Sequence, residues 1–301
     1  MIINRQTIEF ETKQFLTTLF SLQEIERIAI KNIPVTSPTD AKSIEAGLTE
    51  CYHDVLSDVD INLWIRLHPV DFNRPTPVYK SFFSRLQLRD RIFGIVFQEC
   101  DRSKGNKEGM RIVLKSGFRM DVTCHVHCDE AASPLPERDL YRNDMTGSQE
   151  RKSAESVHTN ELFWPEVVNL DKANQFWFCA IQALAKLLRR DYLIADHLSH
   201  MLLMEGLVLQ MMQRDNTYHT NFHRYGYGET LAYQEVDVTG YETYMILPTP
   251  DQTYRRIAEN LIRAVISYDN LALAENSLYE GRREVFFAIW DCYMNGLSYN
   301  Q

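Results

Sequence analysis

The sequence contains no long apolar run. No stretch approaches the roughly 18 uninterrupted apolar residues that mark a membrane-spanning helix, so we expect no membrane span. The amino-terminal segment MIINRQTIEFETKQF is polar and charged throughout, without the apolar centre that a secretory signal contains. These two absences predict a cytoplasmic protein.

Cysteine and positive charge are both scarce. Six cysteines among 301 residues are too few for a disulfide scaffold, which favours reduced thiols. The 41 Asp and Glu residues outnumber the 32 Lys and Arg residues, and the net charge is −9. This acidity counts against a nucleic acid and against an anionic membrane as the partner. It leaves the oligomeric state open.

Internal repeats and low-complexity tracts are also absent, and the sequence pattern changes once along the chain. Residues 1–150 mix helical and strand-like patterns, whereas residues 151–301 are dominated by long helical patterns, with a polar connection over 133–156. The sequence therefore predicts an α+β fold. Its amino-terminal domain (1–150) would be a mixed β-sheet with flanking helices, followed by a helical-bundle domain (151–301).

Hydrophobic periodicity predicts the individual elements. Apolar residues recur at three- and four-residue intervals over 15–30, which predicts a helix. The segment SDVDINLWIRL, residues 57–67, has the β-branched and aromatic content of a strand. By the same criteria we expect strands over 41–47, 93–98, 110–114 and 118–127, and helices over 81–91, 174–190, 192–214, 249–266 and 279–294.

Carboxylates on two of the expected strands are the most informative feature. Asp58 and Asp60 lie two residues apart in a strand, so their side chains project from the same face, roughly 7 Å apart. Such a pair raises the pKa of one carboxyl unless a cation intervenes, and Mg²⁺ prefers these hard oxygen ligands. Asp121, on a later strand, would complete a three-carboxylate site for two Mg²⁺ ions. The alternative is that all three are surface residues at strand ends.

These residues also carry a resemblance to a known family. Gly47, a following loop, Ser57-Asp58-Val59-Asp60 and Asp121 resemble the nucleotidyltransferases of the DNA polymerase β type. The resemblance implies that the three aspartates are catalytic and bind Mg²⁺, and that Gly47 and Ser57 contribute to nucleotide binding. One departure is clear, because the family usually has Gly-Ser where this chain has Gly47-Leu48, and one hydroxyl contact to phosphate is lost.

A narrower resemblance covers most of the chain in order. The segments NQFWFCAIQALAKLLRRDYLIADHL (174–198) and GFRMDVT (117–123) resemble aminoglycoside 6-adenylyltransferases. This implies ATP as co-substrate, transfer of AMP to a hydroxyl of a small molecule, release of pyrophosphate and a role in antibiotic resistance. An acidic cleft would favour a cationic, aminoglycoside-like acceptor by charge.

Two residues of the helical segment are further candidates. A transferase acting on a hydroxyl gains from a general base, and Asp191 is the first candidate for that role. Lys186 is the best candidate, by resemblance, for a contact to the triphosphate, where a cation offsets developing charge. The alternative is that these residues form a solvated helix end.

Two other functions stay open. The Gly47-Leu48 departure fits a degenerate nucleotidyltransferase fold that binds a nucleotide or a partner without turnover. An enzyme of the same fold that modifies a protein or an RNA is the third hypothesis, and the net charge of −9 counts against RNA.

Overall fold

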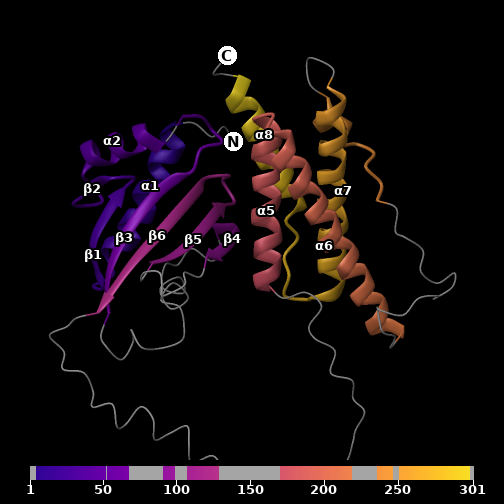
Figure 1. Cartoon of the computed structure of the whole chain (residues 1–301), viewed down its shortest axis with the longest axis horizontal. Helices are drawn as coiled ribbons and strands as arrows, with labels where there is room; N and C mark the ends of the chain where they lie inside the picture. Colours follow the sequence, from indigo (N-terminus) through magenta and orange to yellow (C-terminus); the bar gives the residue numbers. More distant parts are fainter. Residues whose placement is uncertain are drawn as a thin grey trace, which may run out of the picture.

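The computed structural model describes residues 5–51, 53–67, 91–98, 107–128, 170–218, 236–246 and 251–298. Within these ranges a six-stranded mixed sheet is accompanied by helices, which confirms the α+β class (Figure 1). The expected domain boundary near residue 150, the polar connection over 133–156 and nearly all of the expected helix over 81–91 lie outside the described residues. No helix in the described ranges combines the length and the apolar character needed to cross a membrane.

The sheet has the order β2-β1-β3-β6-β5-β4. Its central neighbours β3 and β6 run parallel, and the other pairs described are antiparallel. The strands are β1 Ile25–Ile30, β2 Ile33–Val35, β3 Val59–Leu67, β4 Ile92–Gln98, β5 Lys107–Leu114 and β6 Arg119–Cys128. Because β3 and β6 are parallel neighbours, residues with the same parity in the two strands share one face of the sheet.

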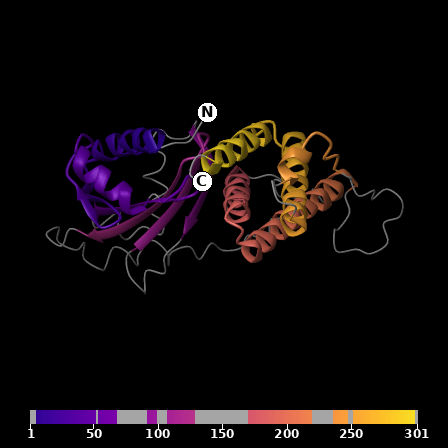
Figure 2. The ribbon, with the colours of Figure 1, turned by 90° about the horizontal axis from the view of Figure 1, so that it is seen from above.

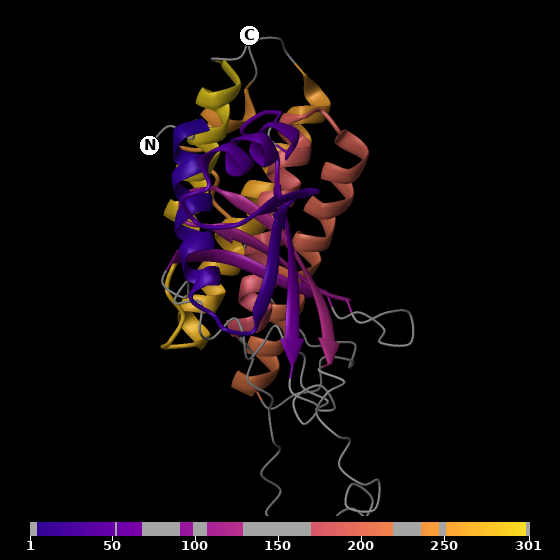
Figure 3. The same ribbon diagram turned by 90° about the vertical axis from the view of Figure 1, so that its left-hand side faces the viewer.

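The two faces of the sheet differ in polarity. In β3, Val59 and Ile61 are buried, whereas Asp60 and Asn62 are partly exposed. The helices α1 (Arg5–Phe20) and α2 (Ala41–Cys51) bury their apolar residues in the same core as Val59 and Ile61. Figure 3 shows both helices lying against the sheet. Polar side chains of the central strands are thus left on the opposite face.

The carboxy-terminal half is helical. It consists of α5 (Leu170–Leu188), α6 (Tyr192–Tyr218), the short 3₁₀ helix η3 (Glu242–Met245), α7 (Gln252–Glu275) and α8 (Arg283–Ser298). Figure 2 shows these helices together on the β4 side of the sheet. Helix α5 approaches β4 very closely, since a Cβ on Gly94 would lie 2.4 Å from the backbone nitrogen of Phe178. Only glycine permits this approach.

The predicted helix over 15–30 is wrong in its second half. Helix α1 ends at Phe20, and Ile25–Ile30 forms strand β1. The apolar residues Phe15 and Leu19 are on the helix, but Ile28 and Ile30 are buried as strand residues of β1, which pairs with both β2 and β3. The apolar residues of these two consecutive elements happen to continue one helical spacing along the sequence.

The predicted strand over 41–47 is also wrong, because these residues begin helix α2. Asp40 caps the helix, its Oδ1 accepting a hydrogen bond of 3.2 Å from the backbone N–H of Ser43. Ile44, Leu48 and Cys51 are buried at four- and three-residue spacing, as on one helix face. The aspartate three residues before Ser43 was the available sequence signal for this helix start.

Candidate active site

The three candidate aspartates share the polar face of the sheet. Asp58 immediately precedes β3, Asp60 lies in β3, and Asp121 lies in β6 in direct register with Asp60. All three side chains are partly exposed, and Asp58 is the most enclosed, with 22% of its side chain accessible. The parallel pairing of β3 and β6 is what brings aspartates from two distant segments of sequence to one surface.

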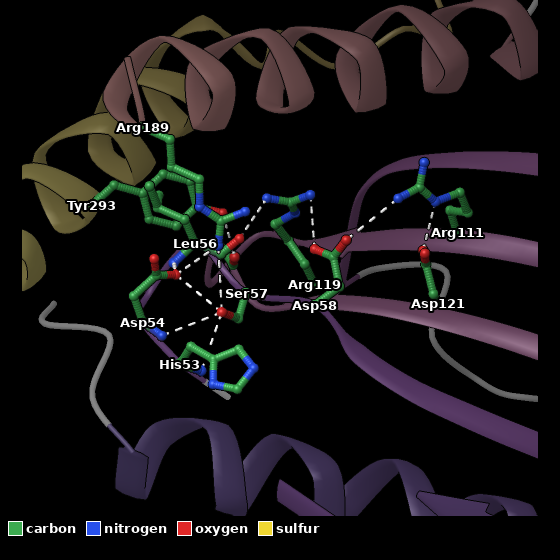
Figure 4. Close-up of polar contacts among 11 residues, drawn as sticks. His53, Asp54, Leu56, Ser57, Asp58, Arg111, Arg119, Asp121, Arg189 and Tyr293 are labelled. Carbon is green, nitrogen blue, oxygen red and sulfur yellow. Dashed lines mark hydrogen bonds and ion pairs between the residues drawn. The ribbon is translucent and has the colours of Figure 1, made fainter. Parts of the chain in front are cut away.

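Arg111 joins two of these aspartates. It lies in β5 opposite Asp121, and its Nε donates to Asp121 Oδ1 at 2.6 Å. Its Nη2 donates to Asp58 Oδ2 at 3.3 Å, so one guanidinium contacts both carboxylates (Figure 4). The pairing raises the pKa of Arg111 above its ordinary value, even though burial acts in the opposite direction.

Arg119 is the second cation at Asp58. This residue is 5% exposed, and its Nη1 donates to the backbone oxygen of Leu56 at 2.9 Å. Its Nη2 forms an ion pair with Asp58 Oδ1 at 2.7 Å. The two groups are not oriented for a hydrogen bond, so this buried oxygen has no hydrogen-bond donor. Burial raises the pKa of Asp58 above its ordinary value, and the charges of Arg119 and Arg111 offset only part of that effect.

Asp60 has its own basic partner, Lys31, in the turn between β1 and β2. The Lys31 Nζ donates to Asp60 Oδ2 at 2.9 Å, and its backbone N–H donates to the Asp60 carbonyl at 2.7 Å. Lys31 adopts a left-handed backbone conformation (φ 57°), which costs a non-glycine residue about 1 kcal/mol. These contacts hold an ammonium group over the edge of the acidic face.

The three carboxylates are therefore chemically suitable ligands for a divalent cation, but each of them already contacts a basic side chain. Three carboxylates are appropriate hard ligands for Mg²⁺, and Asp58 Oδ1, which is ion-paired with Arg119 but accepts no hydrogen bond, could also serve as a ligand. However, in the described part of the chain no three His, Cys, Asp or Glu side chains are grouped closely enough to hold a metal ion. Lys31, Arg111 and Arg119 balance the three acids, so the expected acidic cleft is neutral at this point.

Sequence reasoning missed these three basic residues. The sequence pattern is sufficient to identify Arg119, because this residue lies two positions before Asp121 and so shares its strand face. Arg111 and Lys31 required the pairing of β5 with β6 and of β1 with β3, and no local pattern reveals those registers.

Gly47 does not open a phosphate-binding loop. It lies inside helix α2, where a Cβ would come within 2.6 Å of the Ile30 Cβ. The glycine thus permits close packing of α2 on β1. The nucleotide-binding role expected for Gly47 depended on the loop and has no support in this geometry.

Ser57 serves the loop that precedes β3. Its hydroxyl accepts from the backbone N–H groups of His53 and Asp54 at 3.2 Å and donates to Asp54 Oδ1 at 3.0 Å. A hydroxyl has one donor and two acceptor positions, so all three are used. Arg189, at the end of α5, also donates to Asp54 Oδ1 at 2.8 Å (Figure 4). Ser57 therefore orients the backbone that delivers Asp58, and its expected contact to the nucleotide stays a prediction.

Lys186 and Asp191 pair with each other at the end of α5, Lys186 Nζ lying 3.0 Å from Asp191 Oδ2. The backbone N–H of Asp191 donates to the Lys186 carbonyl and that of Arg190 to the Leu187 carbonyl, which is a Schellman cap. Arg190 takes the left-handed conformation (φ 59°) that this cap requires. These contacts agree with the alternative that Lys186 and Asp191 form the end of a helix. The general-base role of Asp191 and the contact of Lys186 with the triphosphate stay predictions.

A groove lies between α5 and α6, with Tyr268 of α7 also in its wall. Its volume is about 300 Å³, and Phe176, Cys179, Leu202, Glu205 and Leu209 also line it. The pKa of the Cys179 thiol is raised by burial and by the charge of Glu205, while the charge of Arg111 acts in the opposite direction. Phe178, the residue before Cys179, has its ring centre 5.3 Å from the Arg111 guanidinium carbon.

Comparison with known proteins adds little to this geometry. No protein-family model matches the chain, and no curated protein matches it. Among solved structures, an aminoglycoside 6-adenyltransferase from Bacillus subtilis is 11% identical over 95% of this chain and 98% of that one, with a TM-score of 0.26. A TM-score this low does not establish a shared fold, so neither fold nor function is transferred from that match.

Proposed function

We propose that this protein is a Mg²⁺-dependent nucleotidyltransferase that transfers AMP from ATP to a hydroxyl of a small molecule and releases pyrophosphate. The supporting observation is the register of β3 with β6, which places Asp60 beside Asp121, together with the single guanidinium that contacts both Asp58 and Asp121. The sequence resemblance assigns the same three aspartates to the metal site.

In this proposal Asp58, Asp60 and Asp121 hold the metal ions. Bound Mg²⁺ would polarise the α-phosphate, stabilise the leaving pyrophosphate and lower the pKa of the acceptor hydroxyl. The acceptor oxygen forms a bond to the α-phosphorus as the bond from that phosphorus to pyrophosphate breaks, and the hydroxyl proton passes to a general base, for which Asp191 is the candidate. Arg111, Arg119 and Lys31 supply positive charge for the triphosphate.

The groove between α5 and α6 is the candidate acceptor site. Cys179 in its wall is next in sequence to Phe178, whose ring centre lies 5.3 Å from the Arg111 guanidinium carbon. The groove carries one carboxylate, Glu205, and one ammonium group, Lys172, among mostly apolar side chains. A carboxylate balanced by a lysine among apolar side chains suits an acceptor with a large apolar surface better than a polycation. The acceptors to be compared therefore include the aminoglycosides expected from the sequence and less polar hydroxylated amines.

Pyrophosphate release from ATP and Mg²⁺ tests this function. We expect release with at least one member of a panel of aminoglycosides, lincosamides and apolar amino alcohols. Asp58→Asn and Asp121→Asn should each lower the rate at least about 100-fold, because each removes a metal ligand. Asp237→Asn, which changes an exposed carboxylate in a turn, is the matched control and should retain wild-type activity. Wild-type rates in Asp58→Asn would contradict the mechanism.

One observation favours a second candidate function, nucleotide binding without turnover. Each of the three aspartates already contacts a basic side chain, as expected where no metal is used. Calorimetric binding of ATP with no pyrophosphate release across the whole panel would support this function against the first.

A further inference from the structure

Arg111 is held in a position that a bound metal ion would need. Its guanidinium contacts Asp121 Oδ1 at 2.6 Å and Asp58 Oδ2 at 3.3 Å, and these are two of the three carboxylates assigned to the metal. The side chain is about one-third exposed and arises between the buried residues Met110 and Ile112. Its backbone position is therefore fixed by the core, while the guanidinium faces the polar surface.

A third contact comes from the helical half. The guanidinium carbon of Arg111 lies 5.3 Å from the centre of the Phe178 ring, within range of a cation–π interaction. Phe178 is 5% exposed and belongs to the segment of α5 that packs directly against Gly94. An aromatic surface thus remains beside the guanidinium whether or not the carboxylates hold it.

A divalent cation bound between Asp58 and Asp121 would compete with Arg111 for the carboxylate oxygens that its guanidinium contacts. We propose that Arg111 is an exchangeable counter-ion that, together with Arg119, balances the charge of the Asp58–Asp121 pair in the metal-free protein and leaves the pair when a divalent cation binds. This inference rests on the metal site of the proposed function. The released guanidinium then donates to a phosphate of the nucleotide, for which its planar donor set is suited.

Metal affinity in the absence of nucleotide tests the exchange. We would titrate the full-length protein with Mn²⁺ and measure free Mn²⁺ by electron paramagnetic resonance. Arg111→Gln should bind Mn²⁺ about tenfold more tightly than wild type, because the competing charge is gone. Arg111→Lys, which keeps one charge but loses the second contact, should lie between them. Lys115→Gln changes an exposed lysine that follows β5 and should leave the affinity unchanged.

The results separate this inference from the proposed function. Unchanged or weaker Mn²⁺ binding by Arg111→Gln overturns the counter-ion role, even if the wild-type enzyme releases pyrophosphate. Tighter Mn²⁺ binding by Arg111→Gln supports the role, even if no acceptor yields pyrophosphate, and only the proposed function then fails.

A measurement on the wild-type protein covers the case in which Arg111→Gln does not fold. In a ¹⁵N spectrum of the metal-free protein, the Arg111 Nε–H should give a resolved signal, because its hydrogen bond to Asp121 slows exchange with water. The signal is assigned by its absence from Arg111→Lys. Saturating Mg²⁺ should shift or broaden it, and an unchanged signal overturns the proposal.

Discussion

Gly47 illustrates how one residue sets the distance between two elements. A Cβ at this position would lie 2.6 Å from the Ile30 Cβ and 3.2 Å from the Ile30 carbonyl oxygen. Ile30 is fully buried in β1, so neither its side chain nor its backbone has room to move aside. Helix α2 would have to shift away from the sheet to admit a methyl group.

Gly47→Ala should therefore lower the free energy of unfolding by about 1–3 kcal/mol, the usual cost of overpacking a dense core. Gly206→Ala is the matched control in another helix, because its Cβ would meet Ser267 Oγ at an ordinary 3.6 Å. That control should gain about 0.5–1 kcal/mol from the higher helix propensity of alanine. Urea denaturation followed by circular dichroism measures both. Equal stability of Gly47→Ala and wild type would rule out the close-packing role.

At the scale of elements, the end of α5 is attached to the loop that precedes β3. Arg189 Nη2 donates to Asp54 Oδ1 at 2.8 Å and lies 3.4 Å from Ser57 Oγ. Burial acts to raise the pKa of Asp54, but the hydrogen bond and charge of Arg189, with the Ser57 hydrogen bond, lower it overall. The ion pair thus attaches the loop before β3, which ends at Asp58, to the helical half of the molecule.

The lowered pKa of Asp54 predicts a pH dependence of stability. Because the folded-state pKa is below the unfolded-state value of about 3.8, this contribution is present above that value and is lost as pH falls through the folded-state pKa. Arg189→Gln should cost about 1 kcal/mol at pH 7, and its difference from wild type should shrink below about pH 4.

Arg283→Gln is the control for this pH dependence. Arg283 is a partly exposed arginine that donates to the neutral amide oxygen of Asn270 at 3.3 Å, so its small effect should not change over the same range. Urea titrations at several pH values between 3 and 7 measure the differences. A pH-independent penalty in Arg189→Gln would exclude the Asp54 ion pair as its cause.

At the scale of the whole molecule, the sheet and the helices share one core. Phe93 of β4 is fully buried and its ring centre lies 5.2 Å from that of Trp177 in α5. Arg282 Nη1 donates to the Phe93 carbonyl at 2.7 Å, and the Tyr293 hydroxyl of α8 donates to the Gly117 carbonyl at 2.7 Å. Removing the helices would expose apolar side chains and unsatisfied backbone groups of the sheet.

A fragment of residues 1–150 should therefore not fold cooperatively by itself. Each newly exposed large apolar side chain costs about 1.5–3 kcal/mol, and a few of them equal the whole stability of a typical domain. We expect the fragment to bind a hydrophobic dye and to unfold over a broad denaturant range, whereas the full chain gives a single transition. A sharp transition in the isolated fragment would show that the sheet is an independent unit.

Local pattern was sufficient for much of the fold and part of the site. The β-branched and aromatic content of β3 and β6 and the long apolar periodicity of α5 and α7 identified these elements, because each depends on residues that are near in sequence. Side-chain alternation likewise placed Asp58 and Asp60 on one face. Strand β1 and helix α2 differ from the predicted helix and strand, because short apolar runs fit either periodicity.

The sequence by itself therefore determined which side chains leave each strand toward the polar face, since that follows from backbone geometry alone. The tertiary structure decided which of them meet. Asp121 stands beside Asp60, and Arg111 reaches both Asp121 and Asp58, only through the pairing of β6 with β3 and β5. A shift of one residue in either register would send those side chains to the opposite face, and no local signal fixes the register between strands so far apart in the chain.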